Sequence, residues 1–146
     1  MLVGVKGWDI HCLEKIIQAL IKKEQLYCLG YVPEADLPYL YSGAYGFVYL
    51  SIYEGFGLPL LEAMASGVPT LASNVSSMPE VVQNAALLVN PLDVDAITDK
   101  LRLLLMDNAL RNNLSAQSLI QASKFSWEIC IDSTVNLYQK ALAAYS

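Results

Sequence analysis

Short apolar runs alternate, along the first ninety residues, with segments whose apolar positions recur every three or four residues. The runs predict strands at residues 2–4, 27–32, 46–50, 70–73 and 87–89. The segments between them predict helices at residues 11–23, 36–41, 59–66 and 78–83. Buried strands that alternate with amphipathic helices are typical of a parallel sheet covered on both faces. The pattern therefore predicts an α/β fold.

After Pro91 the pattern changes, because three helical segments follow without a strand-like run between them. Asp93, Asp107 and Ser126 precede these segments and suit the N-cap position, where a side-chain oxygen accepts a hydrogen bond from a free backbone N–H. We expect the apolar faces of the first two helices to lie in the core; their members are Ile97, Leu101, Leu104, Leu105, Leu110, Leu114 and Ala122. The last helix is long enough to lie across the domain or onto a neighbour, with the apolar positions Trp127, Ile131, Val135, Tyr138 and Leu142.

Composition narrows the class of protein. A length of 146 residues fits one domain, residues 1–146, and 55% hydrophobic residues suffice for a packed core. The formal charge of -5 leaves no basic surface for a phosphate backbone, so nucleic acid is not an expected partner. Charges, Gly or Pro interrupt every apolar run, so no transmembrane segment is expected. The first residues lack the features of a secretory signal, which favours the cytoplasm.

The histidine and cysteine residues give little support to a metal or redox site. Cys12, Cys28 and Cys130 are far apart and lack the short paired spacing of such sites, so we expect buried or partly buried thiols. His11 is the single histidine of the sequence, which disfavours a His-based metal cluster or a Ser-His-Asp relay. Five tyrosines near the middle of the chain could suggest a stacking platform, but core positions are expected for several of them: Tyr39, Tyr41, Tyr45, Tyr49 and Tyr53.

The most informative segment runs from Ser51 to Pro69, directly after the predicted strand 46–50. Here a strand leads into a glycine loop and then into a helix. Gly55 and Gly57 allow the backbone to approach a ligand closely, and Pro59 suits the first position of a helix. The free amides at the start of a helix favour an anion, so the segment indicates a site for a phosphate or diphosphate.

Two carboxylates flank this loop, Glu54 and Glu62, with seven residues between them. An ionised carboxylate accepts two hydrogen bonds in a geometry that suits adjacent sugar hydroxyls or a ribose diol. Glu62 lies in a helix that is apolar nearly all round, so we expect it to be buried and to need a polar partner. Local roles stay open for both residues: stabilisation by the helix start for Glu62 and a loop hydrogen bond for Glu54.

The stretch Tyr53-Glu-Gly-Phe-Gly-Leu-Pro-Leu-Leu-Glu-Ala-Met-Ala-Ser-Gly-Val-Pro resembles the Glu-x7-Glu signature of the family 4 retaining glycosyltransferases. Further segments match the C-terminal, donor-binding domain of that family in order and spacing: Gly4-Val-Lys-Gly-Trp, Leu29-Gly-Tyr-Val-Pro-Glu-Ala-Asp-Leu-Pro, Leu40-Tyr-Ser-Gly-Ala, Ala72-Ser-Asn-Val-Ser-Ser-Met-Pro-Glu-Val and Phe125-Ser-Trp-Glu. The resemblance implies one half of a GT-B fold: a Rossmann-like three-layer domain with a parallel sheet of about five strands and C-terminal helices.

The resemblance also implies roles for the residues that match the motif. Glu54 would be the catalytic carboxylate and would bind hydroxyls of the transferred sugar, while Glu62 would bind the ribose diol of the nucleotide. The backbone amides of the loop would meet the sugar and the phosphates of the donor; they belong to Gly55, Phe56, Gly57 and Leu58. The donor would be a nucleotide-diphosphate sugar such as a UDP- or GDP-sugar, and neither a cofactor nor a metal ion is expected.

Other residues receive weaker roles from the same resemblance. Tyr31 and Val32 would lie against the base, and Ser51, Glu80 and Lys6 are candidates near the pocket. The basic residues that usually contact the diphosphate, and the whole acceptor-binding N-terminal domain, would precede the region that this sequence covers. The leading hypothesis is a hexosyltransferase donor domain whose activity alone is absent or very weak. The alternative is a catalytically incompetent module that binds nucleotides or a protein partner and needs a second chain.

Overall fold

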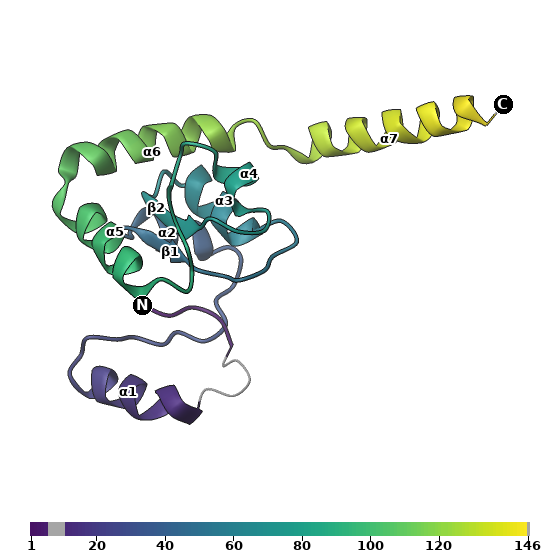
Figure 1. The fold of residues 1–146 in the computed structure, drawn as a ribbon. Helices are drawn as coiled ribbons and strands as arrows, with labels where there is room; N and C mark the ends of the chain where they lie inside the picture. The colour runs from purple at the N-terminus through teal and green to yellow at the C-terminus, as the bar shows by residue number, and fades with distance from the viewer. Residues whose placement is uncertain (6–10, 146) are drawn as a thin grey trace. The chain divides into compact units, whose positions relative to one another are not determined.

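The computed structural model describes residues 1–5 and 11–145. Two compact units make up the chain, Met1–Tyr39 and Leu40–Ser146. The first contains helix α1 (His11–Lys22), and the second contains a sheet with most of the other helices (Figure 1). The prediction of a single domain over residues 1–146 stays a prediction.

The sheet of the second unit is parallel and has three strands, β1 (Phe47–Tyr49), β2 (Thr70–Ser73) and β3 (Leu87–Val89), in the order β1-β2-β3. Tyr49 is paired with Ala72, and Ser73 is paired with Val89. All four residues of the central strand β2 are buried. The strands run in one direction, so their carboxyl ends share one edge, which is where ligands bind in open α/β sheets. The α/β class and the parallel sheet are therefore confirmed.

The two strands predicted nearest the N-terminus form a single parallel bridge in the first unit, between Leu2 and Cys28. The N–H of Leu2 donates to the carbonyl of Tyr27 at 2.8 Å, and the N–H of Leu29 donates to the carbonyl of Leu2 at 3.0 Å. Gly4 and Gly30 have φ angles of +115° and +66°, outside the extended region. The ladder therefore ends after one bridge, and three of the five predicted strands form regular strands in the described part of the chain.

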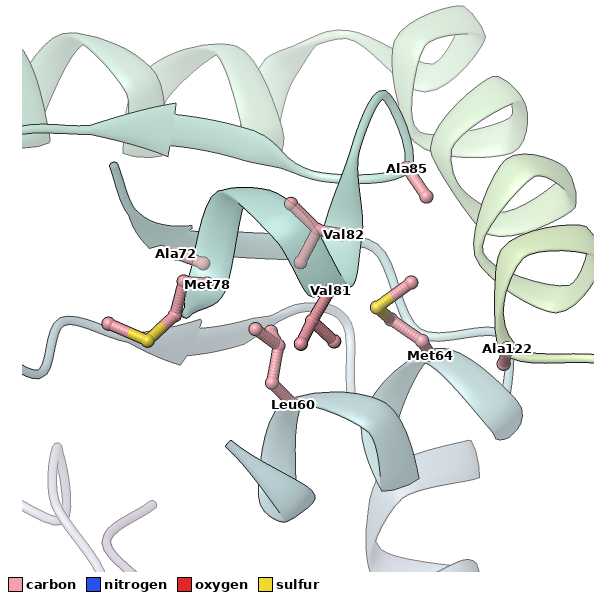
Figure 2. Packing of buried hydrophobic residues seen from close by; sticks show 8 residues of the cluster. All are labelled: Leu60, Met64, Ala72, Met78, Val81, Val82, Ala85 and Ala122. Atoms are coloured by element: carbon pink, nitrogen blue, oxygen red, sulfur yellow. The ribbon is translucent and has the colours of Figure 1, made fainter. Parts of the chain in front are cut away.

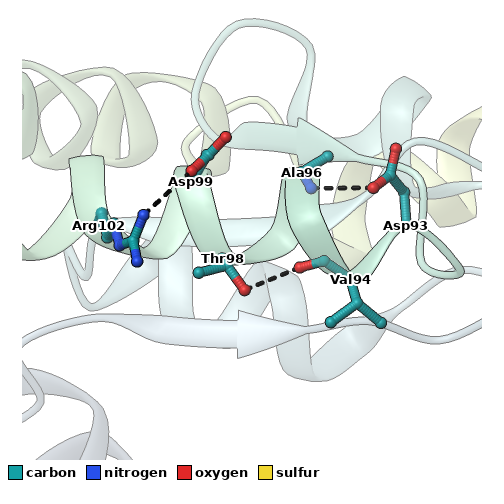
Figure 3. A network of polar contacts seen from close by, with 6 residues as sticks. All are labelled: Asp93, Val94, Ala96, Thr98, Asp99 and Arg102. Carbon is teal, nitrogen blue, oxygen red and sulfur yellow. Dashed lines mark hydrogen bonds and ion pairs between the residues drawn. The ribbon is translucent and has the colours of Figure 1, made fainter.

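The predicted helices all form, and the ends that the sequence predicts shift by at most one residue. They are α1, α2 (Leu37–Ser42), α3 (Leu58–Ala65), α4 (Met78–Val82), α5 (Val94–Met106), α6 (Asn108–Ala122) and α7 (Trp127–Ala144). The three predicted N-caps are confirmed, because the side chains of Asp93, Asp107 and Ser126 each accept a hydrogen bond from the backbone N–H three residues later, at 2.9, 2.8 and 3.2 Å. Figure 3 shows the cap of α5.

Two apolar clusters lie on opposite faces of the sheet, because neighbouring residues of a strand point to opposite sides. Ala72 belongs to the cluster with α3 and α4, whose side chains point toward one another in Figure 2. Leu71 belongs to the other cluster, together with Val89, Leu104 and Leu114 from β3, α5 and α6. Helix α6 contributes to both clusters, since Ala122 joins the first. Helices on both faces of the parallel sheet make the three-layer arrangement that the sequence predicts.

Several apolar and thiol side chains lie outside the core, against expectation. Leu105 is 52% exposed, because α5 turns Leu104 toward the sheet and Leu105 away from it. Helix α7, for which the sequence predicts no core position, has no buried residue, and its apolar positions are 46–72% exposed. Cys28 and Cys130 are exposed free thiols, so the prediction of burial is wrong for both. The side chains of His11 and Cys12 lie outside the described part of the structure.

Candidate functional site

The glycine loop leaves the carboxyl end of β1 and leads into α3. Gly57 is the N-cap of α3 in the left-handed conformation, with φ of 95°, and its carbonyl accepts hydrogen bonds from the amides of Leu60 and Leu61 at 2.9 and 3.2 Å. Pro59 is the second residue of α3, one position later than predicted. A Cβ built on Gly55 would have nothing within 4 Å, so the backbone there is open to a ligand. The loop fits a group that approaches the main chain closely.

The carboxylate of Glu54 is held on one oxygen. The hydroxyl of Tyr49 donates a hydrogen bond to Oε1 at 2.6 Å, and the hydroxyl of Ser51 donates to the same oxygen at 2.8 Å. These bonds, first that of Tyr49 and then that of Ser51, lower the pKa of the Glu54 carboxyl below its ordinary value. Burial and the bond to Glu54 raise the pKa of Tyr49 to about 12. At neutral pH the pair is therefore a neutral phenol and an ionised carboxylate.

The backbone of Glu54 is held from a different loop, the one after β2. The amide of Glu54 donates to Ser76 Oγ at 3.1 Å, and Ser76 Oγ donates back to the carbonyl of Glu54 at 2.7 Å. Ser77 Oγ lies 3.2 Å from the carbonyl of Glu54 and 3.0 Å from that of Phe56, so its single proton is shared between the two acceptors. Ser76 adopts φ of 58°, a left-handed conformation that costs a non-glycine residue free energy. The reciprocal pair offsets that cost.

Glu62 is exposed, so the expectation that it is buried is wrong. Helix α3 turns Leu60, Ala63 and Met64 into the core, and this spacing leaves Glu62 on the opposite side. The hydroxyl of Tyr41 donates to Glu62 Oε2 at 3.1 Å. Burial, and after it the neighbouring charge of Glu62, raises the pKa of Tyr41 well above its ordinary value, so the tyrosine is a neutral donor.

An aromatic row, Tyr41, Phe47 and Tyr49, connects the supports of the two carboxylates. The rings of Tyr41 and Phe47 meet edge to face, with centroids 5.4 Å apart, and the rings of Phe47 and Tyr49 are stacked at 5.9 Å. Sequence reasoning missed the roles of Tyr41 and Tyr49. The available signal was the alternation along β1, which places Phe47 and Tyr49 on one face. Of the five tyrosines, Tyr41 and Tyr49 are half-buried, whereas Tyr39, Tyr45 and Tyr53 are 58–81% exposed and hold no core position.

The remaining predicted site residues are spread over both units. Phe56 packs edge to face on Phe125, with centroids 5.8 Å apart, and Leu58 is half exposed at the start of α3. Tyr31 is 75% exposed in the unit Met1–Tyr39, and Val32 follows it; the contact of both with a base stays a prediction. Glu80 is exposed in the first turn of α4. Lys6 lies outside the described residues.

Among residues 1–5 and 11–145, no group of three or more His, Cys, Asp or Glu side chains is placed to hold a metal ion. In the same part of the chain, no helix combines the length and the apolar character that crossing a bilayer requires. The arrangement at the carboxyl edge of the sheet is instead an open loop flanked by two carboxylates, each with a tyrosine as donor. Such a site accepts hydrogen bonds from hydroxyl groups.

Known sequences resemble this chain over most of its length. A family model described as glycosyl transferases group 1 matches residues 1–119. The O-antigen chain mannosyltransferase B of Escherichia coli is 48% identical over 139 residues, which is 95% of this chain and 36% of that protein. The MMP alpha-(1->4)-mannosyltransferase of Mycolicibacterium hassiacum is 37% identical over 134 residues, 89% of this chain and 33% of that protein. The chain thus spans about a third of the length of these relatives.

Solved structures agree with the fold. A sucrose-phosphate synthase from Thermosynechococcus elongatus superposes with a TM-score of 0.83 and 30% identity, over 98% of this chain and 38% of that one. The HepE protein of Anabaena, solved in complex with UDP, has a TM-score of 0.78 and 21% identity, over 96% of this chain and 40% of that one. At 21% identity, the similarity to HepE shows a shared fold and no more.

Proposed function

The chain belongs to the family of glycosyl transferases group 1, and on that premise we propose that it supplies the donor-binding half of a retaining glycosyltransferase. Its substrate is a nucleotide-diphosphate sugar, from which the sugar passes to an acceptor with its anomeric configuration retained. The fold of this half is Rossmann-like, as in the GT-B structures that it resembles.

One observation carries the proposal: two carboxylates flank an open glycine loop at the carboxyl edge of a parallel sheet, and a tyrosine supports each carboxylate. Hydroxyl pairs of a sugar and of a ribose suit such oxygens as hydrogen-bond donors. The loop between them has an open backbone at Gly55. An acid at each end and amides in the middle match a ligand with a sugar at one end, a ribose at the other and a diphosphate between them.

Each residue then has a defined task. Glu54 binds hydroxyls of the transferred sugar, and Glu62 binds the ribose diol. The amides of the loop bind the departing diphosphate and stabilise its charge, with no metal ion required; they belong to Gly55, Phe56, Gly57 and Leu58. Ser51 acts by holding Glu54 rather than by direct contact with the donor.

Mannose is the sugar that the relatives favour. The two relatives from Escherichia coli and Mycolicibacterium hassiacum are mannosyltransferases, and the first is 48% identical to this chain. We therefore propose a mannose donor. Its nucleotide is to be identified by comparing the binding of UDP, GDP and ADP. Because the chain spans about a third of each relative, we also propose that transfer needs an acceptor-binding domain, on the same or a second polypeptide. Orientation of both substrates contributes several kcal/mol, roughly, to such reactions.

The cytoplasm is the compartment that we propose for this activity. The exposed, unpaired thiols of Cys28 and Cys130 suit a reducing compartment, where disulfides are rare. Fractionation of cells that express the tagged chain tests this part of the proposal, and recovery of the protein from an oxidising compartment would contradict it.

A titration of the isotope-labelled chain, followed by amide NMR, tests the donor site. UDP, GDP and ADP are added first, each followed by its mannose or glucose conjugate, to the wild type, Glu54→Ala and Glu62→Ala. We expect saturable changes in the amide chemical shifts of residues 55–58 with one of the three nucleotides. Glu62→Ala weakens binding of both the nucleotide and the conjugate, whereas Glu54→Ala weakens binding of the conjugate. No shifts at millimolar ligand, where a Kd of ~1 mM corresponds to about 4 kcal/mol, would contradict a working site in this chain.

A further inference from the structure

We propose that Tyr49 is a positioning residue for Glu54: its hydroxyl, together with that of Ser51, holds Oε1 and leaves Oε2 as the oxygen that meets the donor sugar. The inference rests on the proposed function, because it concerns how the sugar-binding carboxylate of that site is aimed. Tyr49 lies on β1 and reaches Glu54 five residues along the chain, at 2.6 Å.

The number of donors on Oε1 decides which oxygen is free. A carboxylate oxygen has two lone-pair positions, and Oε1 receives two donors, from Tyr49 at 2.6 Å and from Ser51 at 2.8 Å. Hydrogen bonds from hydroxyls to a charged oxygen are short and strong, as the first of these is. Together they fix the plane of the carboxylate. No donor from the described residues reaches Oε2, so its lone pairs are available to a hydroxyl from outside the chain.

Tyr49 is itself held firmly enough to aim another side chain. Its backbone is paired with Ala72 of β2, the central and fully buried strand. Its ring stacks on Phe47, with centroids 5.9 Å apart and planes inclined by 18°. Groups carried by a strand and locked by packing hold a site more closely than groups on a loop. Through its hydrogen bond, Tyr49 therefore connects the carboxylate of Glu54, which lies on a glycine loop, to the rigid sheet.

The backbone of Glu54 is fixed independently, by the reciprocal bonds to Ser76 at 3.1 and 2.7 Å. With main chain and Oε1 both restrained, the direction of Oε2 has little freedom left. The lowered pKa of Glu54 agrees with this arrangement, because the carboxylate stays ionised and acts as an acceptor. A rigid acceptor oxygen selects for a sugar hydroxyl at one position, which is a specificity function that Tyr49 supports without touching the sugar.

Tyr49→Phe removes the hydroxyl and keeps the ring, so it tests the aim of Glu54 with little effect on packing. Ser51→Ala is the second variant, and Tyr53→Phe is the matched control, since Tyr53 is adjacent to Glu54 in sequence and 81% exposed. Two quantities are measured on the full chain: the carboxyl pKa of Glu54, by carbon NMR, and the affinities for GDP, GDP-mannose, UDP and UDP-glucose. The useful number is the ratio of conjugate affinity to diphosphate affinity.

The carboxyl pKa of Glu54 is expected to rise in Tyr49→Phe, to rise less in Ser51→Ala and to stay constant in Tyr53→Phe. The affinity ratio is expected to fall about fivefold in Tyr49→Phe, with the diphosphate affinity unchanged, which is the effect of one lost hydrogen bond. An unchanged pKa in Tyr49→Phe overturns the positioning. An unchanged affinity ratio, including the case in which the affinities for diphosphate and conjugate fall equally, overturns the role of Tyr49 toward the sugar. If the wild type binds no nucleotide, the proposed function fails, and the pKa series still decides the positioning.

Discussion

Ser76 and Glu54 bind each other twice: Ser76 Oγ accepts from the amide of Glu54 at 3.1 Å and donates to its carbonyl at 2.7 Å. The two residues are far apart in sequence and belong to loops that follow neighbouring strands, β1 and β2. This pair closes the carboxyl edge of the sheet around the main chain of the candidate catalytic residue. It also explains why a serine is stable at φ of 58°.

Ser76→Ala is expected to lower the free energy of unfolding by about 1–2 kcal/mol, because the amide of Glu54 loses its acceptor and the carbonyl of Glu54 keeps the longer bond from Ser77. Ser76→Gly loses the same bonds but relieves the left-handed strain, so it should be more stable than Ser76→Ala by about 1 kcal/mol. Urea denaturation of both variants measures the difference. Equal stability of the two variants would show that the strain at Ser76 is not significant.

Tyr41→Phe is expected to weaken binding of every nucleotide several-fold, since Glu62 loses the donor that holds Oε2. A diphosphate and its sugar conjugate should lose affinity equally, because the ribose is common to both. The expected result for Tyr49→Phe is different, because that variant should lose affinity for the sugar conjugate and keep its affinity for the diphosphate. Calorimetric titration of both variants with GDP and GDP-mannose separates them, and a sugar-dependent loss in Tyr41→Phe would contradict the assignment of Glu62 to the ribose.

Alkaline pH should destabilise the chain through Tyr49. Its pKa rises from 10.0 to about 12 on folding, so its contribution is complete below pH 10.0 and is lost as the pH approaches 12. The free energy of unfolding should therefore fall across this window. Tyr49→Phe should fall less steeply, whereas exposed Tyr138→Phe should match the wild type. Urea denaturation at several alkaline pH values measures the slopes, and parallel slopes for wild type and Tyr49→Phe would contradict the raised pKa.

Arg111 is expected to stabilise the junction of α5 and α6. Its guanidinium donates to the carbonyls of Leu104 and Leu105 at 3.0 and 2.8 Å, and it lies 4.1 Å above the ring centre of Tyr45. Arg111→Met should lower the free energy of unfolding by about 1–3 kcal/mol, because carbonyls at the end of α5 lose charged donors. Thermal unfolding followed by circular dichroism measures this change.

Arg102→Met is the matched control for that prediction. Arg102 lies on α5 and pairs with Asp99 at 3.6 Å, as Figure 3 shows, but both side chains are more than 70% exposed. Exposed pairs of this kind contribute little, about 0–1 kcal/mol. A loss in Arg102→Met as large as that in Arg111→Met would mean that removal of any cation from this region destabilises the chain.

The local features of the fold were predictable, because they depend on residues a few positions apart. The caps at Asp93, Asp107 and Ser126 are of this kind, since a polar side chain before an apolar helical period has one favourable place. The absence of regular strands at residues 2–4 and 27–32 could also have been predicted, because Gly4 and Gly30 weaken extended structure. The prediction from the apolar pattern nevertheless included both glycines in strands.

The partners of the two acids could not be predicted in the same way. The bond from Tyr41 to Glu62 spans 21 positions, and it depends on how the end of α2 lies against α3. The bond from Tyr49 to Glu54 spans only five, but it depends on the path of a glycine loop. The exposure of Glu62, by contrast, could have been predicted. The helical period of Leu60, Ala63 and Met64 leaves that position outside the buried face.

The aromatic row places one ring, Phe47, between the supports of both acids. In the proposed site, the acid for the sugar and the acid for the ribose thus depend on the same ring, and we expect a change at Phe47 to affect both. The hydroxyls of Tyr41 and Tyr49 differ from that ring, because each bonds to one acid. Tyr41 and Tyr49 are therefore the places where one acid can be altered without the other, whereas Phe47 couples the two.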